Sequence, residues 1–529
     1  MDITGHNLVG YKKRRKGQIK FRTFDAANCA TNEVEHFEAN DEEIDEAVSL
    51  ARKCADEYAN LPGTIRAKFL NAIADEMLDL GDALLEIYCK ESSLPRARAE
   101  GERARTINQL KSFAALLEEG SWLGATIDTA IPDRSPIPKP DLRKMNFALG
   151  PIVVFGSSNF PFAYSTAGGD TASALAAGCP VIVKSHPMHA GTSEMVATAV
   201  VIAAQKINLP EGVFSNLNSR GIDVGKKLVL HEHVKGVGFT GSIQGGRALM
   251  DLAASRKEPI PVFAEMGSVN AVVVLPKAAE HEAAQWAKSL ALSITQGSGQ
   301  FCTKPGMILT LAGSNTDQFC SLLVEEIMKI TPSTMLHPAI NENFKKGLSH
   351  MLVQDGVSIL AKYDEEVKDY VGKQTILKVD GKNFRANQNL HNEVFGPYSL
   401  VVACTDIKEM KEIIENLEGQ LTGTILSFEN ELAQYGDILQ CLKNKVGRLI
   451  LNGVPTGVEV CPSMHHGGPY PSSSDNRFTA VGIHAIYRWL RPVCYQSFPN
   501  EFLPDGLKNE NPLNIVRLVN GLHSRERIL

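Results

Sequence analysis

One cysteine of this sequence lies where a thiol could react. Cys302 sits in the segment Gly299-Gln-Phe-Cys-Thr-Lys-Pro-Gly306, among small and polar residues rather than in the apolar run typical of a buried structural cysteine. A nucleophilic cysteine needs access and backbone N–H groups nearby, and its surroundings must tolerate the thiolate. The pattern therefore favours Cys302, one of ten cysteines, as a nucleophile.

Three other polar side chains follow short apolar runs: Asn159, Lys184 and Glu265. The uncharged amide of Asn159 suits an anion that develops only during a reaction. Glu265 can act as a general base if apolar neighbours raise its pKa. Taken singly, an Asx-turn, a lysine at the rim of a sheet and a solvated glutamate are equally ordinary interpretations.

The turn Gly238-Phe-Thr-Gly-Ser242 also follows an apolar run and precedes a helical pattern. Small residues there let backbone N–H groups at a helix N-terminus approach a phosphate. The G-x-G-x-x-G spacing is absent, so this turn alone is a weak indication of a nucleotide site.

Short apolar runs alternate with helical segments between Gly150 and Leu275, and this pattern predicts an α/β fold with a doubly wound parallel sheet. Ligands of such sheets bind at the carboxyl ends of the strands. We therefore expect Asn159, Lys184 and Glu265 near one edge. A second α/β series covers about 282–447, and the Pro/Ser/Gly-rich segment 453–476 is predicted to be a functional loop.

The remaining segments are predicted to be peripheral. Helices are expected from Asp41, over 65–88 and over 95–117, with the basic run Lys12–Lys16 forming a solvated strand or turn. The proline-rich stretch 129–146 is typical of an extended arm that pairs with another subunit.

Composition excludes several classes of protein. The 529 residues carry a net charge of −6, which argues against general nucleic-acid binding. No apolar run approaches the length of a membrane span, and no signal-peptide pattern is present. The cysteines are scattered without zinc-site spacing, so we expect reduced thiols, a cytoplasmic location and no metal.

The order of these motifs resembles the NAD(P)-dependent aldehyde dehydrogenase superfamily over nearly the whole chain. The matching motifs are P-x-x-x-F followed by Asn159, V-x-V-Lys184, Phe239-Thr-Gly-Ser242, Glu265-x-Gly267, Gly299-Gln-x-Cys302 and Glu393-x-Phe395-Gly-Pro397.

The resemblance implies a role for each site residue. Cys302 would attack the aldehyde and form a thioester, Asn159 and the Cys302 N–H would hold the oxyanion, and Glu265 would activate water. The cofactor, NAD or NADP, would be bound by Lys184, Pro187, Gly241, Ser242, Gly267, Glu393 and Phe395.

The sequence departs from the family pattern at several positions. Glu265 is followed by Met-Gly-Ser-Val269 instead of L-G-G-K, which alters the turn but keeps the base. Pro187 stands where a glutamate often repels a 2′-phosphate, so NADP should be tolerated. Phe301 flanks the nucleophile, and Gln296 replaces a frequent aromatic residue of the tunnel wall.

The resemblance also implies a domain plan. The cofactor-binding domain would comprise 1–128 and 147–264, and the catalytic domain 265–455. A small β oligomerisation arm would comprise 129–146 and 478–500, with a C-terminal tail over 501–529 that packs on the body. A homodimer or homotetramer would follow.

Within the superfamily, the wording of Ser158–Pro180, Gln300–Gly306 and Met464–Asp475 resembles alpha-ketoglutaric semialdehyde dehydrogenases. A bacterial NADP-linked fatty aldehyde dehydrogenase shares much of it. The expected substrate residues are Phe160, Gln296, Phe301, Thr303 and His465. An anionic semialdehyde is favoured because three of them, Gln296, Thr303 and His465, are polar.

The partner of a substrate carboxylate stays open at this point among several basic side chains. The candidates are Arg103, Arg105, Arg477 and the two histidines, His465 and His466. Two other functional classes also stay open. A CoA-acylating dehydrogenase is disfavoured because Glu265 serves hydrolysis, and a non-enzymatic protein would have no reason to keep Cys302, Asn159 and Glu265 together.

Overall fold

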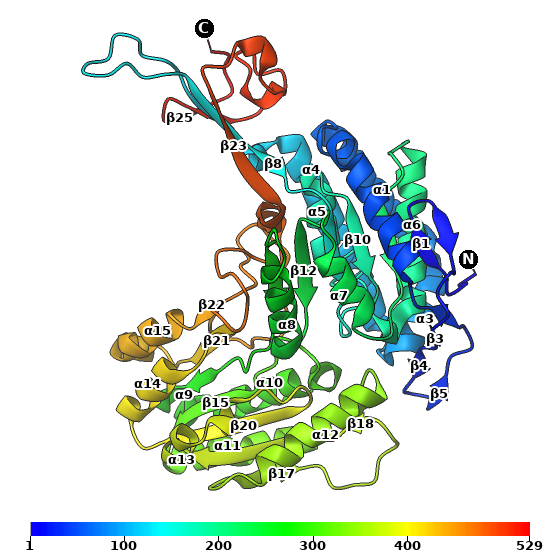
Figure 1. Ribbon diagram of the computed structural model, residues 1–529. Helices are drawn as coiled ribbons and strands as arrows, with labels where there is room; N and C mark the ends of the chain where they lie inside the picture. The colour runs from blue at the N-terminus through cyan, green and yellow to red at the C-terminus, as the bar shows by residue number, and fades with distance from the viewer. Residues whose placement is uncertain (1, 529) are drawn as a thin grey trace.

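The computed structural model describes residues 2–528, which form two large α/β units and a projecting β arm (Figure 1). The first unit contains a seven-stranded sheet in the order β13-β12-β9-β10-β11-β1-β2. Its strands are β1 (Asn7–Val9), β2 (Lys12–Arg14), β9 (Ile152–Phe155), β10 (Val181–Lys184), β11 (Phe214–Leu217), β12 (Gly236–Thr240) and β13 (Val262–Glu265).

The five strands β9 to β13 pair in parallel, and β1 joins β11 antiparallel. Successive residues of β9 enter different cores: Ile152 and Val154 pack in one, Val153 in the other. A strand covered on both faces needs apolar residues throughout, which is why its sequence shows no alternation. The predicted doubly wound sheet is confirmed.

Helices cover both faces of this sheet. They are α1 (Asp41–Ala59), α2 (Gly63–Asp79), α3 (Gly81–Ser92), α4 (Arg96–Glu119), α5 (Gly169–Ala177), α6 (Ala190–Lys206), α7 (Asp223–Leu230) and α8 (Ile243–Ala254). The single helix expected over 65–88 is wrong, because Leu80 caps α2 and Gly81 turns the chain with φ of +57°. Only a residue without Cβ adopts that conformation readily.

The second unit has its own seven-stranded sheet in the order β17-β19-β20-β15-β14-β21-β22. Its strands are β14 (Val272–Val274), β15 (Met307–Leu311), β17 (Ser358–Lys362), β19 (Thr375–Asp380), β20 (Tyr398–Cys404), β21 (Gln420–Leu426) and β22 (Val446–Leu451). Its helices are α9 (Pro276–His281), α10 (Ala283–Thr295), α11 (Ser314–Met328), α12 (Pro338–Leu352), α13 (Gly381–Ala386), α14 (Ile407–Asn416) and α15 (Gly436–Lys443). The chain crosses into this unit directly after Glu265.

The arm is a five-stranded sheet in the order β23-β8-β7-β24-β25 that projects from the body (Figure 1). Its strands are β7 (Thr126–Asp128), β8 (Leu142–Ala148), β23 (Leu490–Gln496), β24 (Arg517–Val519) and β25 (Leu522–Ser524). The expected C-terminal tail does pack on the body, since Leu503, Leu507 and Ile515 join the core cluster of the first unit. Its strand β24 also pairs in parallel with β7 and extends the arm.

Three two-stranded sheets complete the strands: β3 (Lys20–Phe21) with β6 (His36–Phe37), β4 (Phe24–Asp25) with β5 (Ala30–Thr31), and β16 (Ser333–Thr334) with β18 (Val371–Gly372). The basic run near the N-terminus forms the solvated strand β2, as predicted. No helix within residues 2–528 is long and apolar enough to cross a bilayer.

Candidate active site

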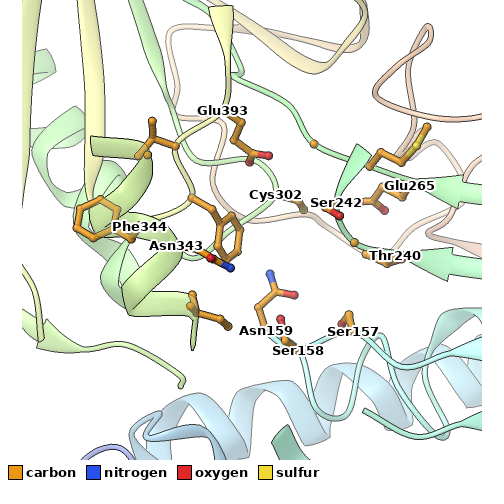
Figure 2. A pocket seen from close by; sticks show the side chains of 17 residues that line it. Ser157, Ser158, Asn159, Thr240, Ser242, Glu265, Cys302, Asn343, Phe344 and Glu393 are labelled. Carbon is orange, nitrogen blue, oxygen red and sulfur yellow. The ribbon is translucent and has the colours of Figure 1, made fainter. Parts of the chain in front are cut away.

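The predicted site residues come from the carboxyl ends of the first sheet and from the second unit. Asn159 follows β9, Glu265 ends β13, and Cys302 follows the short 3-10 helix Gln296–Gly299. The first sheet reverses its strand order between β12 and β9, and such a switch point is where open α/β sheets bind ligands. The structure brings Asn159, Glu265 and Cys302 to one cavity (Figure 2).

A fourth residue, His466, completes this cluster. Its Nε2 lies 3.6 Å from the Cys302 Sγ and 2.9 Å from the Glu265 Oε1, and both His466 and Glu265 are buried. One ligand atom of each of the three residues lies within 4.8 Å of the others. A thiol, an imidazole and a carboxylate therefore form a continuous chain across which a proton can move.

The loop after β22 positions His466. The His466 N–H donates to the Thr479 Oγ1 at 2.9 Å, and the Ala480 N–H donates to the His466 carbonyl at 2.8 Å. The same loop joins the end of β13, because the Met266 N–H donates to the Ser472 carbonyl at 2.8 Å. The imidazole is thus held against Glu265 by backbone contacts on both sides of it.

The surroundings of Cys302 favour its protonated thiol form. Burial and the neighbouring Glu265 carboxylate raise the pKa of Cys302 well above its ordinary value, and Arg105 opposes this only in part. A thiol of that kind needs a base next to it to become a nucleophile. His466 is in that position.

Asn159 is fixed beside the nucleophile by the turn that carries Cys302. Its Nδ2 donates to the Gln300 carbonyl at 3.0 Å. Figure 2 shows its amide pointing into the same cavity that Cys302 lines. An amide held in this way can donate to an oxygen on the carbon that Cys302 attacks.

The cavity has a volume of about 320 Å³. The residues of its wall that the sequence predicted for cofactor binding are Gly241, Ser242, Gly267, Glu393 and Phe395. Ser242 caps α8, whose N-terminus therefore opens on the cavity. The first half of α12, from Ile340 to Gly347, and the segment 393–395 supply the opposite wall (Figure 2).

Glu393 reaches the cavity because Gly267 has no side chain. A Cβ on Gly267 would lie 2.5 Å from the Glu393 Oε2, closer than any real contact. Burial raises the pKa of Glu393 to about 7, while the buried Lys304 works in the opposite direction. The Ser268 N–H also favours the charged carboxylate, so the altered turn after Glu265 still supports this residue.

Lys184 and Pro187 lie outside the cavity wall. Lys184 ends β10, is half-buried, and has its pKa lowered to about 8 by burial. Pro187 begins the short 3-10 helix Pro187–His189 just after it. Both remain at the carboxyl edge of the first sheet, beside β9.

The substrate residues expected from the sequence divide into two groups. Phe160 and Phe301 pack in one apolar cluster with Tyr164, their rings perpendicular and 5.6 Å apart, and Thr303 is buried. Gln296 is exposed at the end of α10, outside this cluster. His465 is half-buried, and its neighbour His466 is the histidine that meets the nucleophile.

Comparison with known proteins decides the family. The model of the aldehyde dehydrogenase family matches residues 18–490. The chain belongs to the aldehyde dehydrogenase family. It is 44% identical over 522 residues to alpha-ketoglutaric semialdehyde dehydrogenase 2 of Azospirillum brasilense, covering 98% of this chain and 99% of that protein. It is 42% identical to the alpha-ketoglutaric semialdehyde dehydrogenase of Acinetobacter baylyi over 91% of each.

Solved structures of the aldehyde dehydrogenase fold agree with this assignment. Lactaldehyde dehydrogenase from Escherichia coli superposes with a TM-score of 0.80 at 21% identity, over 94% of this chain and 99% of that one. Betaine aldehyde dehydrogenase from Staphylococcus aureus, solved with NAD⁺, gives 0.80 at 18% identity over 94% and 97%. The NAD⁺ belongs to that structure; the fold is what the two proteins share.

The residues of this aldehyde dehydrogenase fit a nicotinamide cofactor. The cavity combines a helix N-terminus, a buried carboxylate and a phenyl ring, while Gly241 and Gly267 leave room for close approach. At Gly241 a Cβ would meet the Phe239 ring at 2.6 Å. The sequence did not identify His466 as catalytic, because nothing in a loop pattern tells which of two adjacent histidines faces inward.

Proposed function

We propose that this aldehyde dehydrogenase oxidises alpha-ketoglutaric semialdehyde to alpha-ketoglutarate with NAD or NADP. The observation that carries the proposal is the 44% identity to an alpha-ketoglutaric semialdehyde dehydrogenase over 98% of the chain. The convergence of Cys302, Glu265 and Asn159 on one cavity supports it, because these are the groups that aldehyde oxidation through a thioester requires.

The reaction begins with the Cys302 thiol. The His466 Nε2 accepts the thiol proton across 3.6 Å, and the resulting imidazolium donates to the Glu265 Oε1 at 2.9 Å. The sulfur then attacks the aldehyde carbon. Because burial raises the pKa of this thiol, the thiol loses its proton only when the base is next to it.

The Asn159 amide and the Cys302 N–H donate to the oxyanion that forms on attack. Both donors are fixed by the turn at Gln300, so they need no rearrangement as charge develops. A bound nicotinamide supplies the acceptor for the hydrogen that leaves the aldehyde carbon as hydride. Collapse of the oxyanion leaves a thioester on Cys302.

Glu265 and His466 together release the acid. The Glu265 Oε2 is buried and has no hydrogen-bond partner among the described residues, so it is free to accept a proton from water. Water attacks the thioester, its proton passes to this carboxylate, and the leaving thiolate takes back the proton held by the His466 imidazolium. Because this base is present, hydrolysis rather than transfer to CoA is proposed as the second step.

We propose that Glu393, Phe395, Ser242 and the turn at Gly241 hold the cofactor, with Lys184 at its adenosine end. NADP should be accepted as well as NAD, because Pro187 carries no charge to repel a 2′-phosphate. Burial and His189 hold the pKa of His186 well below its ordinary value, so His186 adds no attraction at neutral pH. The ratio of kcat/KM with NADP to kcat/KM with NAD measures this preference. Pro187→Glu should lower kcat/KM for NADP and leave kcat/KM for NAD unchanged.

The arm supports the proposal of a homo-oligomer, either dimer or tetramer. Exposed apolar side chains lie on the edge strand β25 (Leu522), just after the edge strand β23 (Phe498) and in the loop between β7 and β8 (Ile131 and Ile137). Exposed edges and apolar groups of this kind are usually covered by a partner. Ten cysteines without a disulfide support a cytoplasmic location.

A kinetic panel tests the function. NAD(P)H formation should be fastest, as kcat/KM, with alpha-ketoglutaric semialdehyde, slower with succinic semialdehyde and much slower with decanal, and it should not require CoA. A higher kcat/KM with decanal would instead support the fatty aldehyde alternative. Cys302→Ser should abolish NAD(P)H formation with every aldehyde.

A further inference from the structure

A second apolar surface lies next to Cys302, outside the proposed cofactor cavity. An apolar cluster of Phe160, Ala163, Tyr164, Phe301 and Val481 lies beside the nucleophile, and none of its members lines the cofactor cavity. The Tyr164 ring lies 6.3 Å from the His466 ring, centre to centre. This cluster therefore offers the aldehyde chain an apolar surface outside the proposed cofactor cavity.

Three arginines surround this apolar cluster, but only one of them is neutralised. Arg98 stacks over Phe160 and Phe301 at 4.3 and 4.7 Å and forms an ion pair with Glu102 at 3.3 Å. Neither Arg105 nor Arg448 has a carboxylate within 4.0 Å among residues 2–528. Each also buries its Nε without a hydrogen-bond partner in the same part of the chain.

Arg105 lies on α4 and points toward the nucleophile. Its guanidinium lies 5.7 Å from the Phe160 ring and 5.4 Å from the Tyr164 ring, and an Nη donates to the Tyr164 hydroxyl at 3.3 Å. Its charge opposes the rise in the pKa of Cys302 and so reaches the reacting sulfur. Tyr164 links it to His466, the group beside that sulfur.

Arg448 approaches the same place from β22. Two of its nitrogens donate to the carbonyls of Pro455 and Gly457, at 2.6 and 3.0 Å, which fixes the start of the loop that carries Val458 and Val460 over the cluster. Burial lowers the pKa of Arg448, and Cys302 and Tyr164 are the acidic groups that oppose this. The chain thus places two guanidinium groups without a carboxylate partner beside one apolar cluster.

We propose that Arg105, assisted by Arg448, binds the carboxylate of an anionic aldehyde and so selects a semialdehyde over an alkanal. A half-buried cation without a carboxylate partner is costly, and the substrate carboxylate would offset this cost through a forked, charge-assisted pair. Alpha-ketoglutaric semialdehyde carries its carboxylate at the end of the chain away from the aldehyde. This inference rests on the proposed function and identifies the residues that would give it its specificity.

The sequence contains four basic candidates besides Arg105 for the partner of the substrate carboxylate: Arg103, Arg477, His465 and His466. The structure removes Arg103 and Arg477 from the site: Arg103 donates to the Gly81 carbonyl, and the exposed Arg477 pairs with Asp475. Arg448 was not among the candidates, because it lies inside an apolar strand sequence where a half-buried strand residue is the ordinary interpretation.

The test compares two substrates of similar length, alpha-ketoglutaric semialdehyde and pentanal. Arg105→Met should lower kcat/KM for the semialdehyde by about 10- to 100-fold, mainly through KM, because a hydrogen bond to a charged group contributes on the order of 1.5–3 kcal/mol. The value for pentanal should stay the same or rise. Arg105→Lys and Arg448→Met should show smaller losses of the same selectivity.

Arg103→Met is the matched control on the same helix, and both substrates should be unaffected by it. A second readout uses the product. Alpha-ketoglutarate should raise the Tm of the wild type and of Arg103→Met, and it should raise the Tm of Arg105→Met by a smaller amount. Equal losses with semialdehyde and pentanal, or no loss with either, would overturn the inference. Should Arg105→Met not fold, the selectivity ratio of Arg105→Lys decides in its place.

This outcome is distinct from a failure of the proposed function. If the wild type prefers another anionic aldehyde, the function is wrong but the selective loss in Arg105→Met still holds for that anion. If the wild type prefers pentanal, both the function and the inference fail, and the variants then show no loss of selectivity for anions.

Discussion

The His466 Nε2 and the Glu265 Oε1 lie 2.9 Å apart, and neither side chain has appreciable contact with solvent. This pair joins the end of β13 to the loop after β22, over 200 residues apart in sequence. Under the proposed mechanism, this one contact gives the Cys302 thiol a base and gives the carboxylate that would activate water a partner. The catalytic predictions below follow from it.

Replacing His466 by Gln should leave the fold intact and lower kcat by about 10²- to 10⁴-fold, the usual contribution of a positioned general base. The rate of Cys302 alkylation by iodoacetamide at neutral pH should fall in parallel. His465→Gln is the control, since His465 is half-buried next to the same backbone but does not contact the sulfur. An unchanged kcat in His466→Gln would show that another group takes the thiol proton.

Replacing Glu265 by Gln should separate the two halves of the reaction. NAD(P)H should still form in a burst equivalent to the enzyme concentration, while steady turnover falls by about 10²-fold or more, because the thioester then lacks its general base. Rapid-quench measurement of the burst checks this, with Glu258→Gln, at the exposed Lys235–Glu258 pair, as a control. Loss of the burst itself would instead place Glu265 in the attack step.

The pH dependence of alkylation reports the state of Cys302. A raised pKa means that the protonated thiol persists to higher pH, so the thiolate fraction at pH 7 is small and grows as pH rises through the folded value. The alkylation rate of the wild type, less that of Cys302→Ser, should therefore still be rising above pH 9. A plateau near pH 7 would indicate a resting thiolate paired with an imidazolium.

Adding one methyl group at Gly267 should weaken cofactor binding. The new Cβ would lie 2.5 Å from the Glu393 Oε2 and displace it from the cavity, at a cost of about 1–3 kcal/mol. The KM for NAD should rise accordingly, with a smaller change in the KM for aldehyde. Gly101→Ala is the control, because a Cβ there meets nothing within 4 Å in α4 and should only stabilise the helix.

Much of the fold could be predicted from the sequence, because strands buried on both faces have a distinctive pattern. The runs at Val181 and Val262 were expected as parallel strands and are β10 and β13. The arm was less predictable: β24 and β25 are three-residue strands, and the pairing of β24 with β7 joins residues nearly 400 positions apart. Strands this short contain too few residues for their pairing to be predicted from the sequence.

The site was predictable where a motif fixes one residue after a strand, as with Asn159 and Glu265. It was not predictable in the loop after β22, where no period relates sequence to direction. His465 and His466 are adjacent and chemically identical, and only the backbone bonds to Thr479 and Ala480 determine which one turns toward Cys302. The role proposed for Arg448 could not be predicted for a related reason, because its hydrogen-bond partners are carbonyls of the same loop.

The contact between Met266 and Ser472 has a consequence for how the enzyme is made. A growing chain releases Cys302 from the ribosome long before it releases His466, and domains fold as they emerge. Until the loop after β22 arrives, Cys302 has no imidazole beside it. We therefore expect nascent and truncated chains to react more slowly with electrophiles than the finished enzyme, in which this loop has docked against the end of β13.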